Sequence, residues 1–349
     1  MTEPGPLTGR NSLAHQVANP AAAASALLPG RAGEEGAAAA ARPAPRRTRP
    51  QGSARLLSMP SRLVMWGGLS IGLAVFVLFG IVPVAANLVV SFTNYSGLAG
   101  SSTSFDGFIN YVHLVTSQRP GFVASLVATV IFVVGVTVVQ NAIGMMLAHR
   151  LQGDSRTAAF LRILAFLPIV LGVTVVGLIW LLLFDPSGGP GTSAFSALGV
   201  HSSFFGSSTA ALPLVIVVQV WQNLGFTMVV FVGGLKAIPH SVYDAAALDG
   251  VTPWRRFRRV TWPLMAPSVT VNVLFAVIGS LTTYNLIYVL TDGAFNTNTL
   301  GMLAFNSAFG PSADLGFGAA VTTVLFVVTL LVALPLATAL RARERRLLT

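Results

Sequence analysis

Cysteine is absent from this chain of 349 residues. Without thiols the chain has no disulfide bond, no thiolate metal ligand and no cysteine nucleophile. Charge is scarce as well, since Asp, Glu, Lys and Arg together make up 9% of the residues, whereas hydrophobic residues make up 54%. An ordinary soluble domain has about 25% charged residues. These proportions exclude a soluble globular protein and indicate an integral membrane protein.

The chain has a single lysine, Lys236, and it follows Leu235. A nucleotide-binding P-loop requires Gly-Lys-Ser or Gly-Lys-Thr, so the chain cannot hydrolyse ATP by that route. The five histidines are scattered without the spacing of metal ligands. No reactive group of residues then remains for a membrane enzyme. We therefore expect a protein that is not an enzyme and that has no metal site and no cofactor of its own.

Six apolar stretches are long enough for the roughly 20 residues that a helix needs to cross the hydrocarbon. They predict an all-α integral membrane protein with six transmembrane helices, at Leu63–Val90, Phe122–Leu147, Ile163–Phe184, Ala210–Leu235, Ser268–Leu290 and Phe317–Leu340. Residues 1–61 are rich in Ala, Pro, Gly and Arg and have no apolar periodicity, which predicts a disordered tail. The transmembrane domain then covers residues 62–346, with a polar loop at 236–266, and a short end follows at 347–349.

Basic residues fall almost entirely on one side of the predicted spans. The tail, the loop after the second span, the loop at 236–266 and the C-terminal end hold 20 of the 21 Lys and Arg residues, whereas the other side has only Arg119. By the positive-inside rule, both termini and the loop at 236–266 are cytoplasmic. This topology explains the net charge of +10, so we expect no nucleic-acid partner. The arginine-rich run at 42–49 is either a solvated charge run or a contact with anionic membrane lipid.

No Asp, Glu, Lys, Arg or His lies inside the six spans. Proton- or sodium-coupled transporters use ionisable groups at membrane depth, so this kind of coupling is not expected. Uncharged polar residues do occur in three groups, of which the smallest is Gln140 with Asn141 in the second span. Gln219, Gln222, Asn223 and Phe226 share one face of the fourth span, and Ser280, Thr282, Thr283, Tyr284 and Asn285 cluster in the fifth. Such groups either line a path for a neutral sugar or polyol or join the helices to one another.

The loop at 236–266 contains signals for two short helices. Ser241 stands three residues before Asp244, a capping-box spacing that predicts a helix start, and Gly250 can supply the left-handed residue that ends the helix. Thr252 and Pro253 suit the cap and the first residue of a second helix. Three consecutive alanines, residues 245–247, allow another protein to approach the first helix closely. The pattern predicts a docking surface.

The same loop resembles the EAA loop of binding-protein-dependent ABC importer permeases. The matching residues follow the order and spacing of that family, with Lys236-Ala-Ile-Pro239, Tyr243-Asp-Ala-Ala, Leu248-Asp-Gly250, Trp254, Phe257 and Thr261-Trp-Pro-Leu264. Two positions depart from the family pattern, because Asp244 stands where Glu is usual and Val251 where a small residue is expected.

Further stretches narrow the resemblance to carbohydrate permeases like those of the maltose and glycerol-phosphate systems. They are Ser91-Phe-Thr-Asn-Tyr95, Phe166-Leu-Pro168, Phe184-Asp-Pro186, Leu286-Ile-Tyr-Val-Leu-Thr-Asp-Gly293 and Leu315-Gly-Phe-Gly-Ala-Ala320. The resemblance covers about Leu63 to Arg346.

This resemblance implies the type I ABC importer permease fold and a function that is divided among chains. The chain is then one transmembrane permease of an ATP-driven sugar importer in a bacterial inner membrane. Its implied partners are a second, different permease, two ATP-binding subunits that bind the ATP, and a lipid-anchored or periplasmic sugar-binding protein. The resemblance assigns ATPase coupling to Asp244, Ala245, Ala246, Asp249 and Gly250. It assigns the substrate pathway to Gln219, Gln222, Asn223, Phe226, Ser280 and Thr283.

Alternatives stay open at this level. The cargo is a mono-, di- or oligosaccharide, or instead glycerol phosphate or another polyol, since amides and hydroxyls do not separate these ligands. A secondary transporter that exchanges substrates without ion coupling has a similar composition. A membrane-embedded enzyme or assembly factor forms a third class, and its catalytic pair is missing from the sequence.

Overall fold

The computed structural model describes residues 61–97, 100, 102–311 and 314–348. The tail predicted at residues 1–61 therefore lies outside the described residues, except for Ser61. The chain divides into two units, Met1–Leu63 and Val64–Thr349. Apart from the first turn of α1, everything described below belongs to the second unit.

The described residues form helices joined by turns, which agrees with the predicted all-α class. The helices are α1 (Ser61–Phe76), η1 (Val77–Ile81), α2 (Val82–Val90), α3 (Ile109–Val115), α4 (Arg119–Leu151), α5 (Arg156–Val170), α6 (Val173–Leu183), α7 (Pro190–Ala197), η2 (Phe204–Gly206), α8 (Ala211–Lys236), α9 (His240–Leu248), α10 (Pro253–Arg256), η3 (Phe257–Thr261), α11 (Trp262–Leu264), α12 (Ala266–Thr282), α13 (Asn285–Thr291), α14 (Leu300–Phe309) and α15 (Leu315–Leu348). η1 and η3 are π-helical turns, and η2 is a 3-10 turn.

Four helical segments of the described chain are long and apolar enough to cross a membrane. They are Trp66–Val90, Gly121–Leu151, Ala211–Lys236 and Leu315–Leu347, and they correspond to the first, second, fourth and sixth predicted spans. Two sharply bent pairs, α5 with α6 and the α10–α11 segment with α12, raise the number to six if each pair counts as one span. With both pairs counted, the total equals the six predicted spans, although the second pair starts in the loop at 236–266 and bends ahead of the fifth predicted span. The third and fifth predicted spans are not continuous helices.

The third predicted span, Ile163–Phe184, is wrong as a single helix. α5 ends at Val170, α6 begins at Val173, and the two helices are bent by 101°. The residues between them, Leu171 and Gly172, have extended backbone with ψ of 135° and 144°. A break among apolar surroundings leaves carbonyls that need donors inside the protein. Gln222 of α8 supplies one, because its Nε2 donates to the Leu171 carbonyl oxygen at 3.3 Å.

The fifth predicted span, Ser268–Leu290, is interrupted as well. α12 ends at Thr282, Thr283 is extended with ψ of 121°, and α13 begins at Asn285. The start of α14 lies against this break, since a Cβ built on Gly301 would stand 3.0 Å from the Thr283 carbonyl oxygen. Glycine at position 301 therefore lets α14 approach the broken backbone closely.

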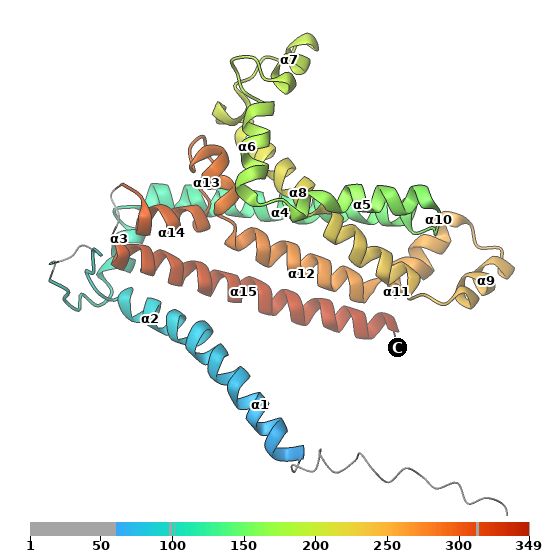
Figure 1. Cartoon of the computed structure of the whole chain (residues 1–349), viewed down its shortest axis with the longest axis horizontal. Helices are drawn as coiled ribbons and strands as arrows, with labels where there is room; N and C mark the ends of the chain where they lie inside the picture. The colour runs from blue at the N-terminus through green and yellow to red at the C-terminus, as the bar shows by residue number, and fades with distance from the viewer. Residues whose placement is uncertain (1–60, 98–99, 101, 312–313, 349) are drawn as a thin grey trace, which may run out of the picture. The chain divides into compact units, whose positions relative to one another are not determined.

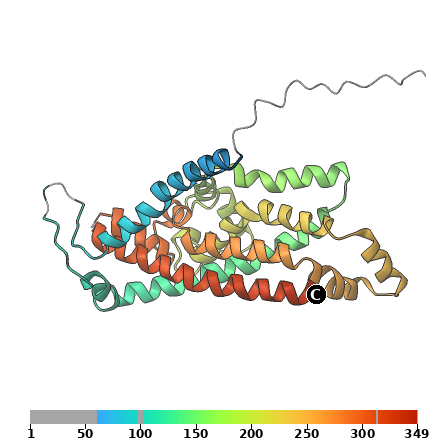
Figure 2. The same cartoon turned by 90° about the horizontal axis from the view of Figure 1, so that it is seen from below.

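α4 and α8 pack against each other along the middle of the second unit (Figure 1). α12 and α15 lie side by side in both views (Figure 2). A buried hydrogen-bond chain joins α4, α8 and α12, in which Gln140 Nε2 donates to Thr227 Oγ1 at 2.7 Å and Asn272 Nδ2 donates to the Thr227 carbonyl oxygen at 3.2 Å. Side-chain bonds of this kind hold apolar helices in one register.

The ends of these helices bring the loop at 236–266 together with basic residues from several segments. Lys236, at the end of α8, pairs with Asp154 between α4 and α5, with 2.6 Å between Nζ and Oδ1. Arg162 of α5 donates to the carbonyl oxygens of Leu151 and Gly153. The end of α15 reaches the same place, because Arg343 lies over the ring of Trp262. Basic residues assigned to one side of the membrane thus meet at one end of the helices.

Candidate functional site: a docking loop and a polar helix face

α9 begins directly after Pro239 and projects beyond the end of α8 (Figure 1). Pro239 occupies the N-cap position with φ of −59° and ψ of 139°. The predicted capping box is wrong, because Ser241 is the second residue of the helix and no side chain caps the helix start. The pyrrolidine ring fixes φ at Pro239, so the helix starts two residues earlier than a Ser241 cap would place it.

The end of α9 follows the prediction. Gly250 has a φ of +65°, the left-handed conformation that residues with a Cβ resist. The Gly250 N–H donates to the Ala247 carbonyl oxygen at 3.1 Å, and the Val251 N–H donates to the Ala246 carbonyl oxygen at 3.2 Å. This pair of bonds is a Schellman motif, which satisfies the last carbonyls of a helix. No atom lies within 4 Å of a Cβ built on Gly250, so the space beside it is open.

One face of α9 is anchored to the protein. Val242 and Tyr243 pack against a buried cluster that includes Ile238. The guanidinium carbon of Arg256 lies 5.8 Å from the centre of the Tyr243 ring. Ala246 is also turned inward and is only 6% exposed. Its side chain is therefore not available to a partner, and its part in the loop is to accept the hydrogen bond that closes the helix.

The opposite face of α9 is exposed. Asp244, Ala245 and Asp249 lie on the surface, and the Leu248 side chain is 90% exposed. Among the described residues, the Asp244 carboxylate has no hydrogen-bond or ion-pair partner. This face combines a free carboxylate, a small residue and a large apolar side chain, and it belongs to the loop that the sequence predicts to dock another protein.

The second half of the loop is held against α4. Thr252 occupies the N-cap position of α10 and Pro253 its first turn, as predicted, although Thr252 makes no capping hydrogen bond. The ring of Phe257 stands 6.2 Å from that of His149 at the end of α4. Trp254 stacks on Phe257 with 5.9 Å between the ring centres and is itself 69% exposed. The loop thus presents Trp254 outward from a fixed base.

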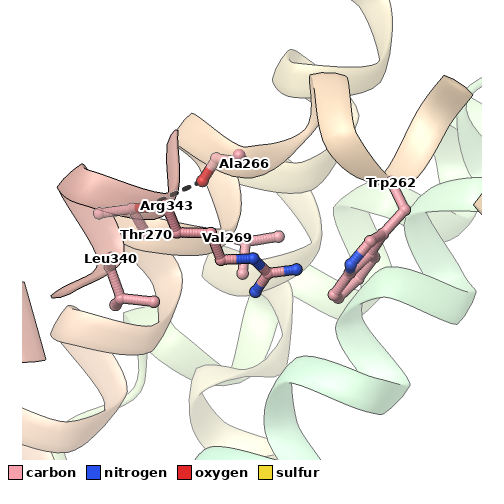
Figure 3. Close-up of a pocket in the computed structure, with 6 residues that line it drawn as sticks. All are labelled: Trp262, Ala266, Val269, Thr270, Leu340 and Arg343. Carbon is pink, nitrogen blue, oxygen red and sulfur yellow. Dashed lines mark hydrogen bonds between the residues drawn. The ribbon is translucent and has the colours of Figure 1, made fainter. Parts of the chain in front are cut away.

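The loop is also joined to the end of α15 (Figure 3). Figure 3 shows the Arg343 side chain extending toward the indole ring of Trp262, and its guanidinium carbon lies 5.9 Å from the ring centre. Beside them, Thr270 Oγ1 donates to the Ala266 carbonyl oxygen at 2.9 Å. The space enclosed by these residues is only about 10 Å³, room for about one water molecule. This contact is a structural joint and is too small to bind a substrate.

The ion pair between Lys236 and Asp154 is the main electrostatic interaction beside the loop at 236–266. The hydrogen bond from Lys236, together with its positive charge, lowers the pKa of the Asp154 carboxyl group. Among the described residues, no three His, Cys, Asp or Glu side chains are placed to hold a metal ion.

The four pathway candidates on α8 do not share one environment. Gln219, Asn223 and Phe226 are half-buried, and Asn223 Nδ2 donates to the Gln219 carbonyl oxygen at 2.9 Å. Phe226 packs on Phe275 of α12, with 4.6 Å between the ring centres. Gln222 is instead buried, and its amide binds the broken backbone between α5 and α6. The first three residues therefore line a partly exposed face, whereas Gln222 has a structural partner.

Of the two candidates on the fifth span, Thr283 forms its break and Ser280 lies three residues earlier, in α12. Ser280 is 2% exposed, and its hydroxyl oxygen has no hydrogen-bond partner among the described residues. Thr283 is half-buried and donates from Oγ1 to the Gly279 carbonyl oxygen at 2.7 Å. Thr283 therefore lies at irregular backbone, the kind of position that lines cavities in membrane proteins, whereas Ser280 is buried within the last turn of α12.

Three further residues belong to these surfaces but were not assigned from the sequence. Leu248 and Trp254 are large apolar side chains exposed on the loop at 236–266, called the docking loop below. Phe275 is 56% exposed and lies beside Phe226. Leu248 follows Asp244 by four residues, so helical spacing alone places them on one face. No local signal separates Trp254 or Phe275 from the many aromatic residues that pack inside a membrane protein.

Comparison with known proteins identifies the family. The model of the family described as "Binding-protein-dependent transport system inner membrane component" matches residues 140–346, which is more than half of the chain. The chain belongs to this family. The matched residues include α8, the whole loop at 236–266, α12 to α14, and α15 as far as Arg346.

Two relatives and one solved structure extend this comparison. The multiple sugar-binding transport system permease protein MsmF of Streptococcus mutans is 31% identical over 268 residues, which cover 75% of this chain and 90% of the relative. The diacetylchitobiose uptake system permease protein NgcF of Streptomyces coelicolor is 30% identical over 281 residues, which cover 76% and 78%. A bacterial ABC transporter involved in the import of the acidic polysaccharide alginate has a chain that matches with a TM-score of 0.70 at 18% identity, covering 81% of this chain and 96% of that chain. This likeness confirms the predicted ABC importer permease fold.

Proposed function

We infer that this chain is one transmembrane permease subunit of an ATP-driven importer and that its cargo is a sugar. The family match supports the permease role, and the names of two relatives, for multiple-sugar transport and diacetylchitobiose uptake, support a sugar cargo. The face formed by Gln219, Asn223 and Phe226 offers amides for sugar hydroxyls and a ring on which a sugar can stack. The absence of charged residues from the predicted spans favours a neutral sugar over glycerol phosphate.

The observation that carries this proposal is the exposed face of α9. Leu248 is 90% exposed at a polar end of the molecule, beside the unpaired Asp244 carboxylate and the open space at Gly250. An ATPase subunit that receives α9 in a cleft would cover Leu248 and Ala245 and approach Gly250 without a clash. Since the chain has no P-loop of its own, such a contact is the route by which ATP hydrolysis reaches it.

The proposed assembly contains a second permease, two ATP-binding subunits that bind the ATP, and an external sugar-binding protein. Two permeases are needed because the half-exposed faces of α8 and α12 line only one side of a path. By the positive-inside rule, both termini and α9 lie on the cytoplasmic side of a bacterial inner membrane. The opposite ends of the helices, with Asp185 and Asp292, then face the binding protein.

Transport into proteoliposomes tests the proposal. The chain is reconstituted with the second permease and the ATPase, and uptake is measured with the binding protein present, across a panel of sugars and glycerol phosphate. We expect ATP-dependent uptake of a neutral sugar. Gly250→Pro or Asp244→Lys should abolish uptake and coupled ATP hydrolysis while the protein still inserts, because both changes disrupt the docking face.

Other outcomes would point to the alternatives. Uptake of glycerol phosphate and of no sugar would contradict the proposed cargo. Unchanged uptake by both variants would remove the coupling role of α9. Uptake by the purified chain alone, in vesicles without ATP, would instead support a secondary transporter that exchanges substrates.

A further inference from the structure

A cleft of about 1050 Å³ lies beside the docking loop, between the ends of α4 and α8 on one side and α9, α10 and η3 on the other. Its floor is apolar, since Met145, Leu235 and Ile238 line it and are buried. Met146 also lines the cleft and is 56% exposed. None of the assigned coupling residues of α9 lines this cleft, so it is a separate feature of the loop end.

The rim of the cleft is basic. Arg150, Lys236 and Arg256 line it, and Asp154 is the only acidic residue among the lining side chains. Asp154 is already engaged by Lys236 at 2.6 Å. Among the described residues the Arg150 side chain has no hydrogen bond or ion pair, and the Arg256 guanidinium lies over the ring of Tyr243 without an ion pair. Two arginines therefore stay without a counter-charge at the rim of the cleft, where they can pair with an anionic ligand.

The shape of the cleft decides which anion fits. An inorganic phosphate would satisfy the arginines but would leave the apolar floor of methionine, leucine and isoleucine exposed to water. A phospholipid places its phosphate at the basic rim and its glycerol and acyl carbons on the apolar floor. The cleft also lies at the ends of the spans α4 and α8, where the head groups of a bilayer begin, and basic pockets there suit anionic head groups. Trp254 at the rim is a residue type that favours this boundary.

We propose that this cleft binds an anionic phospholipid, with Arg150 and Arg256 on its phosphate and Met145, Met146 and Ile238 against its apolar part. The lipid lies beneath α9 and η3, so it braces the base of the docking loop. The inference concerns a lipid and does not depend on which sugar the transporter carries.

A lipid titration of the purified full chain tests this site. The chain is delipidated in uncharged detergent, and its unfolding temperature is followed while phosphatidylglycerol, phosphatidylcholine or inorganic phosphate is added in separate arms. We expect saturable stabilisation by phosphatidylglycerol only. Arg150→Gln with Arg256→Gln should weaken this binding about 30-fold, since each cation beside an anionic head group contributes roughly a factor of five.

The control is Arg258→Gln with Arg259→Gln, which removes the same charge from exposed positions of η3 that do not line the cleft. This control should bind phosphatidylglycerol as the unchanged chain does, and Arg150→Lys with Arg256→Lys should retain most of the binding. Equal loss in the control pair, or no preference for phosphatidylglycerol over phosphatidylcholine, would overturn the proposal. Equal stabilisation by inorganic phosphate would overturn the lipid assignment and leave a soluble phosphate as the ligand.

Discussion

At the scale of the residue, Gly250 controls the docking loop through its backbone. Its φ is +65°, and no atom lies within 4 Å of an added Cβ, so a substitution here acts through strain and not through a clash. Asn adopts this conformation more readily than Ala, and a β-branched residue resists it most. We expect hydrogen exchange at the end of α9 to increase in the order Gly, Asn, Ala, Val, with about 1–2 kcal/mol of strain for Ala. Equal protection in the Val and Gly proteins would contradict this account.

Asp154 gives a prediction about pH. Its pKa is lowered below the ordinary value of 3.8, chiefly by the hydrogen bond from Lys236. A lowered pKa in the folded state means that the pair stabilises the fold above the ordinary value and loses this effect as the pH falls through the lowered value. The difference in unfolding temperature between the unchanged chain and Asp154→Asn should therefore be constant above about pH 5 and shrink in stronger acid. A difference that grows on acidification would contradict the assignment.

At the scale of the element, Gln222 tests how the broken third span is held. Gln222→Leu removes the donor to the partly buried Leu171 carbonyl oxygen, and the loss of such a hydrogen bond costs about 1 kcal/mol. The matched control is Asn223→Leu, whose amide bonds only within its own helix. We expect a lower unfolding temperature for the Gln222 variant, and altered sugar uptake with near-normal stability for the Asn223 variant. The opposite pattern would make Gln222 the pathway residue.

Two glycines of α8 test how closely α5 and α8 pack. A Cβ at Gly225 would collide with the Ala165 carbonyl oxygen and with Phe166 Cα, whereas a Cβ at Gly233 would meet no atom within 4 Å. Gly225→Ala should therefore lower the free energy of unfolding by roughly 1–3 kcal/mol through overpacking. Gly233→Ala, with the same change in the same helix, should leave it unchanged or raise it by up to about 1 kcal/mol. A similar effect at both positions would show that α5 does not pack closely against Gly225 of α8.

The continuous spans and the end of α9 could be predicted from the sequence because each depends on neighbouring residues. Apolar runs define the first, second, fourth and sixth spans, and Gly250 and Pro253 mark the turns of the loop. The break at Thr283 has no local breaker and could not be predicted, whereas Pro168 and Gly172 mark the break at Leu171–Gly172 locally; distant groups satisfy or crowd both breaks. These groups are the Gln222 amide and the close approach allowed by Gly301.

The candidate site likewise has one part that the sequence predicts and one part that depends on tertiary packing. Its position along the chain follows from motif spacing, which identified the exposed Asp244, Asp249 and Gly250. Which face of α9 points outward depends on tertiary packing of Val242 and Tyr243, and this packing turns Ala246 inward. The same packing leaves Leu248 exposed, which a hydrophobicity pattern by itself would have placed inside.

At the scale of the whole molecule, the proposed function gives the spans the transport path and the loop at 236–266 the contact with the ATPase. The half-exposed face on α8 and α12 is where a path can form, whereas α9 lies at the end of the helices where basic residues gather. The contacts of Phe257 with α4 and of Trp262 with α15 attach the loop to helices that run the length of the unit. If an ATPase docks on the loop as proposed, these contacts would pass a displacement of the loop to the spans as movement of packed helices.

The central claim is that α9 receives an ATPase subunit, and one exposed leucine tests it most directly. Leu248→Asp is compared with Leu198→Asp, because both leucines are largely exposed, at 90% and 79%, and only Leu248 lies on α9. The measurement is the affinity of each detergent-purified permease complex for its ATPase subunit. We predict that Leu248→Asp weakens this affinity about 30-fold or more, as for the centre of a protein interface, and that Leu198→Asp leaves it unchanged. Equal affinity of the two variants and the unchanged chain would contradict the account.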